Sequence, residues 1–349
     1  MVKAKLNSLV RSTEHNDLLH IHINRPKALN ALNKKIIREI ASLVREAHNQ
    51  SKNVLFTGEG RAFSAGGDVV SIIKADITPE EFYQEEFTLI YFVSRMLTER
   101  VAIMDGIVMG GGVGLSMACS IRVATNNTAF AMPEGAIGYI PDVGASYFLS
   151  RMNPPELGLY LSLTGERLSG VDCYLFGLAQ YYIECDTDLI ISGLYEGSIE
   201  NVLQVYHVNP SWEKSSIIPY LDQIKQCFII DGTVELVVKK LSQLDTPWTV
   251  KTLQKIQTMC PLSLKISYEA FRRGKSMTYK DCLAMEYNLV VQMQSQRSIN
   301  FLEGVRHKLV VKASGTPNWV PDDLIELGDG SILPYFANKE GPRLELPRL

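Results

Sequence analysis

The sequence predicts an α/β structure in its first half and a mainly helical structure in its second half. Short apolar runs alternate with amphipathic stretches up to about residue 150, and strand-like runs become few beyond that point. Two glycine-rich segments each lie between a predicted strand and a predicted helix. The 349 residues are enough for one large domain or two ordinary ones. We place a core region at 3–185 and a mainly helical region at 186–349.

The composition is that of a folded globular protein and excludes several classes of function. Hydrophobic residues make up 46% of the chain, and the formal net charge is −3. This charge gives no reason to expect direct nucleic-acid binding, which usually needs a basic face. The six cysteines form no CxxC pair, so we expect a reduced intracellular protein without a metal site. The longest apolar stretch, 101–121, contains Asp105 and five glycines, so no membrane-spanning helix is predicted.

The first predicted elements are two strands followed by a helix. Residues 6–11 and 18–23 have strand patterns, with a polar turn at 13–17, and the second strand ends before Pro26. A helix is predicted over 33–50 because its apolar residues recur on one face. These residues are Ile36, Ile37, Ile40, Leu43, Val44 and Ala47.

Strands and helices then alternate until about residue 150. A helix is predicted over 79–97, where Pro79 is followed by acidic residues that suit the positive end of the helix dipole. Short strands are predicted at 54–57, 101–104, 121–124 and 129–132. The later predicted helices are 157–164, 170–177, 188–205, 216–228, 233–243, 247–259, 262–272 and 279–295.

The two glycine-rich segments are AFSAGGD at 62–68 and GIVMGGGVG at 106–114. Backbone N–H groups at strand–helix junctions are unpaired, and glycine lets a ligand approach them closely. One interpretation of the glycines is that two converging N–H groups form an oxyanion hole. The other is that they only allow tight packing of strand against helix. The spacings of the common nucleotide-binding loops are absent, so those loops are not predicted to bind a nucleotide.

Two carboxylates, Glu134 and Asp142, lie in an apolar run rich in glycine and proline at 131–144. Isolated acids in such surroundings are turn caps or functional groups with altered proton affinity. Asp142 precedes a predicted helix, so helix capping also explains it, while Glu134 has no such explanation. No histidine lies near either acid, so local sequence does not support a Ser/His or Cys/His nucleophile.

Several segments in the right order resemble the crotonase (enoyl-CoA hydratase/isomerase) superfamily, and within it the 3-hydroxyisobutyryl-CoA hydrolases. The segments are NRPKALNAL at 24–32, AFSAGGD at 62–68, MGGGVGLS at 109–116, FAMPEGAIGYIPDVGASYFL at 130–149, PLSLKISYEAFRRG at 261–274, CLAMEYNLV at 282–290 and FLEGVRHKLV at 301–310. The resemblance implies a crotonase-like spiral of ββα turns followed by a helical C-terminal region. It also implies an acyl-CoA substrate, with coenzyme A as part of the substrate and no other cofactor or metal.

The resemblance also implies roles for individual residues. It places the thioester carbonyl oxygen against the backbone N–H groups of Ala65 and Gly111. Glu86 is implied to bind a hydroxyl of the acyl group, although Glu85 and Glu86 also fit solvated helix acids. The remaining residues implied to contact substrate are Gly66, Gly67 and Asp68, with Arg25 and Lys27 as candidates for the CoA phosphates.

The acids favour hydrolysis over hydration. Hydratases of the superfamily carry a glutamate at the position of Gly114 and usually a glycine at that of Asp142, whereas Glu134 and Asp142 match the hydrolases. The resemblance therefore implies hydrolysis of 3-hydroxyisobutyryl-CoA, or a similar 3-hydroxyacyl-CoA, in valine breakdown. Glu134 attacks the carbonyl to form a mixed anhydride or activates a water, and Asp142 orients the substrate hydroxyl or assists proton transfer to the thiolate. The alternatives are an enoyl-CoA hydratase or isomerase, and a hydrolase-like component of the mitochondrial ribosome.

The resemblance implies a mitochondrial location, with the cytoplasm and the peroxisome as alternatives. The basic start of the chain, 1–13, suits a transit peptide, and the last three residues loosely resemble a peroxisomal signal. Assembly into a homo-oligomer is left open by the sequence.

Overall fold

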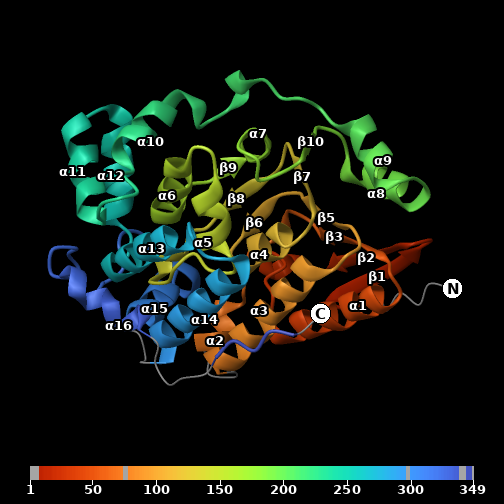
Figure 1. Cartoon of the computed structure of the whole chain (residues 1–349), viewed down its shortest axis with the longest axis horizontal. Coiled ribbons are helices and arrows are strands. Elements are labelled where there is room, and N and C mark those ends of the chain that lie inside the picture. The colour runs from red at the N-terminus through yellow and green to blue at the C-terminus, as the bar shows by residue number, and fades with distance from the viewer. Residues whose placement is uncertain (1–7, 74–77, 296–298, 338–342, 348–349) are drawn as a thin grey trace.

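The computed structural model describes residues 8–73, 78–295, 299–337 and 343–347. Two β-sheets lie at the centre, with helices around them (Figure 1). The larger sheet has the strand order β1-β2-β3-β5-β7-β10, and all its neighbours are parallel except β1 and β2. Its strands are β1 (Val10–His15), β2 (Leu18–Ile23), β3 (Asn53–Gly58), β5 (Arg100–Met104), β7 (Ile121–Thr125) and β10 (Tyr181–Ile183).

The smaller sheet has the order β4-β6-β8-β9, in which only β8 and β9 are antiparallel. Its strands are β4 (Ala62–Ser64), β6 (Ile107–Met109), β8 (Ala129–Ala131) and β9 (Leu168–Ser169). From β3 to β8, each strand of the larger sheet is followed by one of the smaller sheet, and helices come before the next pair. This repeated strand–strand–helix unit confirms the predicted spiral.

The helices within the spiral follow from capping and apolar periodicity. In α1 (Lys34–Asn49), five of the six predicted face residues are buried, and the Asn33 side chain accepts a hydrogen bond from the N–H of Ile36 (2.9 Å). Thr78 caps α3 (Pro79–Arg95) in the same way, and α1 packs against α3. The other helices here are α2 (Val69–Ile73), α4 (Gly111–Met117), α5 (Ala145–Phe148), α6 (Pro155–Thr164) and α7 (Gly170–Leu175).

The described part of the chain after β10 contains helices joined by loops, and no strand. Its α-helices are α8 (Thr187–Glu196), α9 (Ile199–Tyr206), α10 (Leu221–Cys227), α11 (Val234–Leu244), α12 (Pro247–Gln257), α13 (Pro261–Gly274), α14 (Tyr279–Ser295), α15 (Ile299–Val305) and α16 (Leu333–Phe336). Helix α13 packs on α5 and α6, and α14 packs on α3. The C-terminal segment returns to α3, where Gln84 Nε2 donates to the carbonyl of Glu345 (2.7 Å; Figure 1).

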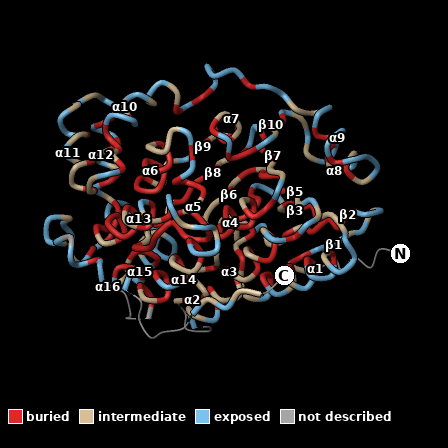
Figure 2. Tube along the Cα trace, viewed as in Figure 1, coloured by how far each residue is buried: buried red, intermediate tan, exposed pale blue. Residues whose placement is uncertain are grey.

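The buried residues are concentrated where the sheets meet α3, α4, α13 and α14, while the outer turns of α10–α12 are largely exposed (Figure 2). A second, smaller apolar cluster lies between α8–α9 and the larger sheet, and it includes Leu55, Ile103, Ile190 and Leu203. Within the described ranges, no helix combines the length and the apolarity that crossing a membrane requires.

Two predicted boundaries were wrong for identifiable reasons. The polar turn expected at 13–17 is part of β1, which continues to His15, and the turn is at Asn16, whose φ is +54°. This edge strand is partly exposed, so its polar residues resemble a turn (residues 6 and 7 lie outside the described ranges). The helix predicted over 188–205 is divided at Gly197, and Ser198 caps the second helix, α9.

Candidate active site

A cavity of about 400 Å³ lies where the two glycine-rich segments meet α3, the 133–142 segment and residues 308–309. Its lining comprises Leu29, Ala65, Gly66, Gly67, Val69, Tyr83, Glu86, Ile107, Met109, Gly110, Gly111, Pro133, Glu134, Ala136, Ile137, Tyr139, Asp142, Arg167, Lys308 and Leu309. The cavity therefore collects the glycines and the three acids that the sequence singled out.

The two glycine-rich segments come too close together for side chains at key positions. Gly66 has φ +99°, and a Cβ placed there would lie 3.0 Å from the carbonyl oxygen of Met109 and 3.2 Å from the nitrogen of Gly111. A Cβ on Gly111 would collide with Oε1 of Glu86. Gly110 has φ +48°, a conformation that L side chains rarely adopt. Glycine is required at these positions because the two segments lie so close together. This agrees with the interpretation of the sequence in which the glycines serve tight packing.

Two backbone N–H groups at this junction are available to a ligand. Gly111 is the first residue of α4, and the ideal Cβ position on it lies 3.3 Å from the nitrogen of Gly67. Within the described part of the chain, neither Gly67 nor Gly111 donates its N–H to a protein acceptor. The N–H of Ala65 does not fit its predicted role, because it already donates to the carbonyl of Leu29 (2.9 Å). The geometry favours Gly67 as the partner of Gly111.

Three carboxyl groups are buried at the cavity. Glu86, Glu134 and Asp142 are exposed to only 2%, 6% and 4%. Glu86 Oε1 and Glu134 Oε2 have no hydrogen-bond partner among the described residues, whereas Asp142 Oδ2 accepts from the Tyr139 hydroxyl (2.8 Å). Such orphaned buried oxygens are costly in a folded protein, so these two point to a bound group.

The structural alternatives for two of these acids are excluded. The side chain of Asp142 does not cap α5, because Gly144 is the N-cap residue and makes no side-chain bond. Glu86 is not a solvated helix acid, whereas the neighbouring Glu85 is paired with Arg38 at the surface (2.8 Å). The burial of Glu86 and Asp142 therefore needs another explanation.

The electrostatics of the cavity favour protonated acids. Burial, reinforced by the charge of Asp142, raises the pKa of Glu86 and of Glu134 well above the usual range. Burial also raises the pKa of Asp142 to about 7, although the hydrogen bond from Tyr139 opposes this. Strongly perturbed acids gathered in a cavity are typical of functional sites.

The remaining predicted residues lie outside the cavity. Arg25 donates to Asp68 Oδ2 (2.7 Å) and to the carbonyl of Ala31, so this pair joins two loops next to the site. Lys27 is exposed and does not line the cavity. The cations that do line it, Arg167 and Lys308, were not predicted. Lys308 belongs to a segment of the family resemblance, but nothing in the local sequence distinguishes Arg167.

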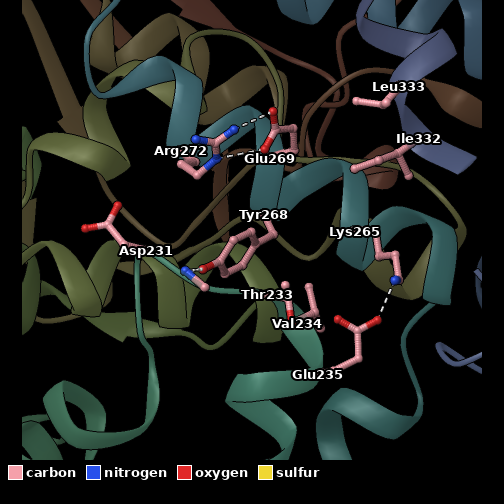
Figure 3. A pocket seen from close by; sticks show the side chains of 11 residues that line it. Asp231, Thr233, Val234, Glu235, Lys265, Tyr268, Glu269, Arg272, Ile332 and Leu333 are labelled. Atoms are coloured by element: carbon pink, nitrogen blue, oxygen red, sulfur yellow. Dashed lines mark hydrogen bonds and ion pairs between the residues drawn. The ribbon is translucent and has the colours of Figure 1, made fainter. Parts of the chain in front are cut away.

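A second cavity, of about 460 Å³, lies between α11, α13 and the start of α16 (Figure 3). Its cations are paired: Lys265 forms an ion pair with Glu235, and Arg272 with Glu269 (2.8 Å). The Tyr268 hydroxyl donates to a backbone carbonyl. Because these charges offset one another, we place the candidate site at the first cavity.

The raised pKa of Asp142 predicts how stability depends on pH. The folded state keeps this proton up to about pH 7, whereas the unfolded chain loses it near pH 3.9, so folded protein binds more protons in between. The free energy of unfolding should therefore fall as pH rises from about 5 to 7. Urea unfolding at both pH values measures this. Asp142→Asn should make the dependence shallower, and the part that remains comes from the other buried acids, Glu86 and Glu134. An equally steep dependence in the variant would contradict the assignment.

Comparisons with known proteins show which family the chain belongs to. A family model described as enoyl-CoA hydratase/isomerase matches residues 18–336. A Xenopus tropicalis protein named 3-hydroxyisobutyryl-CoA hydrolase, mitochondrial, is 38% identical over 344 residues, covering 93% of this chain and 88% of the relative. The human protein of the same name is 37% identical over 335 residues, covering 91% and 86%.

A solved structure has the same fold over nearly the whole chain. It is described as a carnitinyl-CoA dehydratase from Mycobacterium thermoresistibile, with a TM-score of 0.90 and 34% identity, and the match covers 97% of this chain and 99% of that one. The chain therefore belongs to the enoyl-CoA hydratase/isomerase (crotonase) family, in the group whose curated members are named 3-hydroxyisobutyryl-CoA hydrolases.

Proposed function

We propose that the protein hydrolyses the thioester of 3-hydroxyisobutyryl-CoA, or of a closely similar 3-hydroxyacyl-CoA, to the free acid and CoA. The observation that carries the proposal is that the buried Glu134 lines the same cavity as Gly67 and Gly111. Among the described residues, Oε2 of Glu134 has no hydrogen-bond partner and the two N–H groups have no protein acceptor. Hydrolysis needs a nucleophile or base next to a carbonyl whose oxygen is held by preorganised donors. The names of the relatives at 34–38% identity support the same reaction.

The oxyanion is bound by the backbone. The acyl carbonyl oxygen accepts from the N–H of Gly67 and from that of Gly111 at the N-terminus of α4. As the carbonyl carbon becomes tetrahedral, negative charge develops on this oxygen. Fixed donors stabilise that charge without reorganising.

Glu134 acts as the nucleophile or as the general base. Its carboxylate either attacks the carbonyl carbon, giving a mixed anhydride and releasing the CoA thiolate, or takes a proton from an attacking water. In the first route, water then cleaves the anhydride and restores Glu134. Both routes need the ionised form, and burial opposes ionisation, so turnover should rise with pH on the acidic side.

The other two acids act on the remainder of the substrate. Glu86 lies against Gly111, and its free Oε1 is suited to accept a hydrogen bond from the substrate hydroxyl. Asp142 orients this hydroxyl or gives a proton to the departing thiolate. The pKa of Asp142, about 7, allows either form near neutral pH.

Coenzyme A enters this reaction only as part of the substrate. Arg167 and Lys308 line the cavity and offer positive charge to the CoA phosphates. The name "mitochondrial" carried by several relatives supports a mitochondrial location for this chain.

The surroundings of Gly114 argue against hydration of an enoyl-CoA. A Cβ at this position would lie 2.5 Å from Cβ of Val143 and 2.7 Å from Cδ1 of Ile90. Val143 therefore occupies the space that the glutamate carried by hydratases at this position would need.

A panel of acyl-CoA thioesters tests the proposal. Thiol release from 3-hydroxyisobutyryl-CoA should exceed that from isobutyryl-CoA, which lacks the hydroxyl, by at least about tenfold, the scale of a buried polar group left unpaired. A thiol-reactive dye follows release, and absorbance of the enoyl thioester follows hydration. Hydration of crotonyl-CoA without thiol release from any member of the panel would overturn the proposal.

A further inference from the structure

Glu286 is a fully buried carboxylate that does not line the cavity. It projects from α14 and has 0% exposure. Its Oε2 accepts from the N–H of Gly144 (2.6 Å), and its Oε1 accepts from the N–H (2.7 Å) and the hydroxyl (2.6 Å) of Ser146. A side chain far along the sequence thus holds the backbone that immediately follows Asp142.

The segment held in this way has an unfavourable backbone conformation. Val143 has φ +52° and Gly144 has φ +96°. A β-branched residue at positive φ is a genuine outlier, and such strain persists only where the surroundings impose it. A Cβ on Gly144 would lie 2.7 Å from the Tyr279 ring, so α14 also restricts this residue sterically.

The strained turn fixes Asp142 from its C-terminal side. The N–H of Ala145 donates to the carbonyl of Asp142 (2.9 Å), which closes the turn. On the N-terminal side, Tyr139 holds the carboxylate of Asp142. If Gly144 and Ser146 were released, Val143 would be free to return to negative φ, and the Asp142 side chain would turn with it.

We propose that Glu286 is a positioning residue for thioester hydrolysis: by holding Gly144 and Ser146 it maintains the strained turn that directs Asp142 into the cavity. The inference rests on the proposed function, because it needs Asp142 to act on the substrate. A misplacement of about 1 Å at a reacting group can cost about 10²-fold in rate.

The main test is Glu286→Gln, which keeps the size of the side chain. It replaces one accepting oxygen by an NH2 group, which cannot accept a hydrogen bond from Gly144 or Ser146. We expect kcat for 3-hydroxyisobutyryl-CoA to fall at least tenfold while KM changes less than threefold. Ser146→Ala, which removes only the hydroxyl contact, should have an intermediate effect. The matched control is Asp172→Asn, since Asp172 is also fully buried and accepts from the hydroxyls of Ser215 and Ser216, away from the cavity. Per folded molecule, its kcat should stay within threefold of the wild type.

A double variant separates positioning from general stabilisation. If Glu286 acts through Asp142, adding Glu286→Gln to Asp142→Asn should change kcat less than threefold. The same loss in both backgrounds, or an unchanged kcat in Glu286→Gln alone, would overturn the inference while leaving the proposed function intact. A wild-type protein that releases no thiol would overturn both.

Discussion

Replacing Glu134 by Gln should lower the turnover of 3-hydroxyisobutyryl-CoA by about 10³-fold or more. The substitution keeps the volume of a side chain that is 6% exposed, so the fold should be retained. It removes the group that attacks the carbonyl or accepts the proton of water, and such groups contribute about 10²–10⁴-fold. Oε2 of Glu134 has no hydrogen-bond partner among the described residues, so the amide should not destabilise the protein. Above neutral pH the variant should be more stable than the wild type, because the substitution removes a buried negative charge.

The measurement is single-turnover release of CoA, together with thermal unfolding at pH 8. Glu85→Gln is the matched control, because Glu85 lies at the surface, paired with Arg38, on the helix that also carries Glu86. It should turn over at the wild-type rate. Retention of more than about a tenth of the wild-type turnover in Glu134→Gln would remove Glu134 from the mechanism.

Replacing Gly111 by Ala should cost about 10²–10³-fold in kcat/KM. The added methyl group would collide with Oε1 of Glu86 and lie 3.3 Å from the nitrogen of Gly67. It would therefore occupy the space that the carbonyl oxygen needs and displace a second acid. The expected magnitude is that of losing an oxyanion-hole donor.

Gly135→Ala provides the control for adding a methyl group nearby. Gly135 lies in the same segment as Glu134, and a Cβ there would have an ordinary contact of 3.5 Å with Sδ of Met259. Its kcat/KM should remain within about twofold of the wild type, consistent with a neutral packing change. Equal activity of the two alanine variants would show that the carbonyl oxygen binds elsewhere.

Helices and strands could be predicted from the sequence where their apolar residues recur with one clear spacing. The apolar face of α1 identifies a helix, because one side is buried and the other is not. In β2 the alternation of apolar residues with histidines identified the strand, although both of its faces are largely buried. The edge strand β1 was placed too early because its residues are polar on the exposed side. The break at Gly197 was missed because apolar residues on both sides continue a helical pattern. The strands β9 and β10, of two and three residues, carry too little pattern and were not recognised, although the equally short β8 was predicted.

The candidate site was predictable as far as residues stand out locally. Glu134 and Asp142 do so because they are charged residues within an apolar run. The choice between Ala65 and Gly67 could not be made from sequence, since it depends on Leu29 accepting one of the two N–H groups. Arg167 reaches the cavity, and Glu286 reaches the turn after Asp142, only because tertiary packing brings distant segments together. Their roles, like those of the other site residues, stay predictions for the experiments above.

The path of the chain has a consequence for biosynthesis. The glycines and Glu134 leave the ribosome long before α14 and residues 308–309, which supply the Glu286 contacts and one wall of the cavity. A nascent chain that ends in the α8–α9 region therefore contains Glu86, Glu134 and Asp142, but it lacks the residues that enclose and orient them. Catalytic activity should therefore appear late and abruptly, when the last helices dock. Chains truncated before α14 should be inactive even if their sheets have formed.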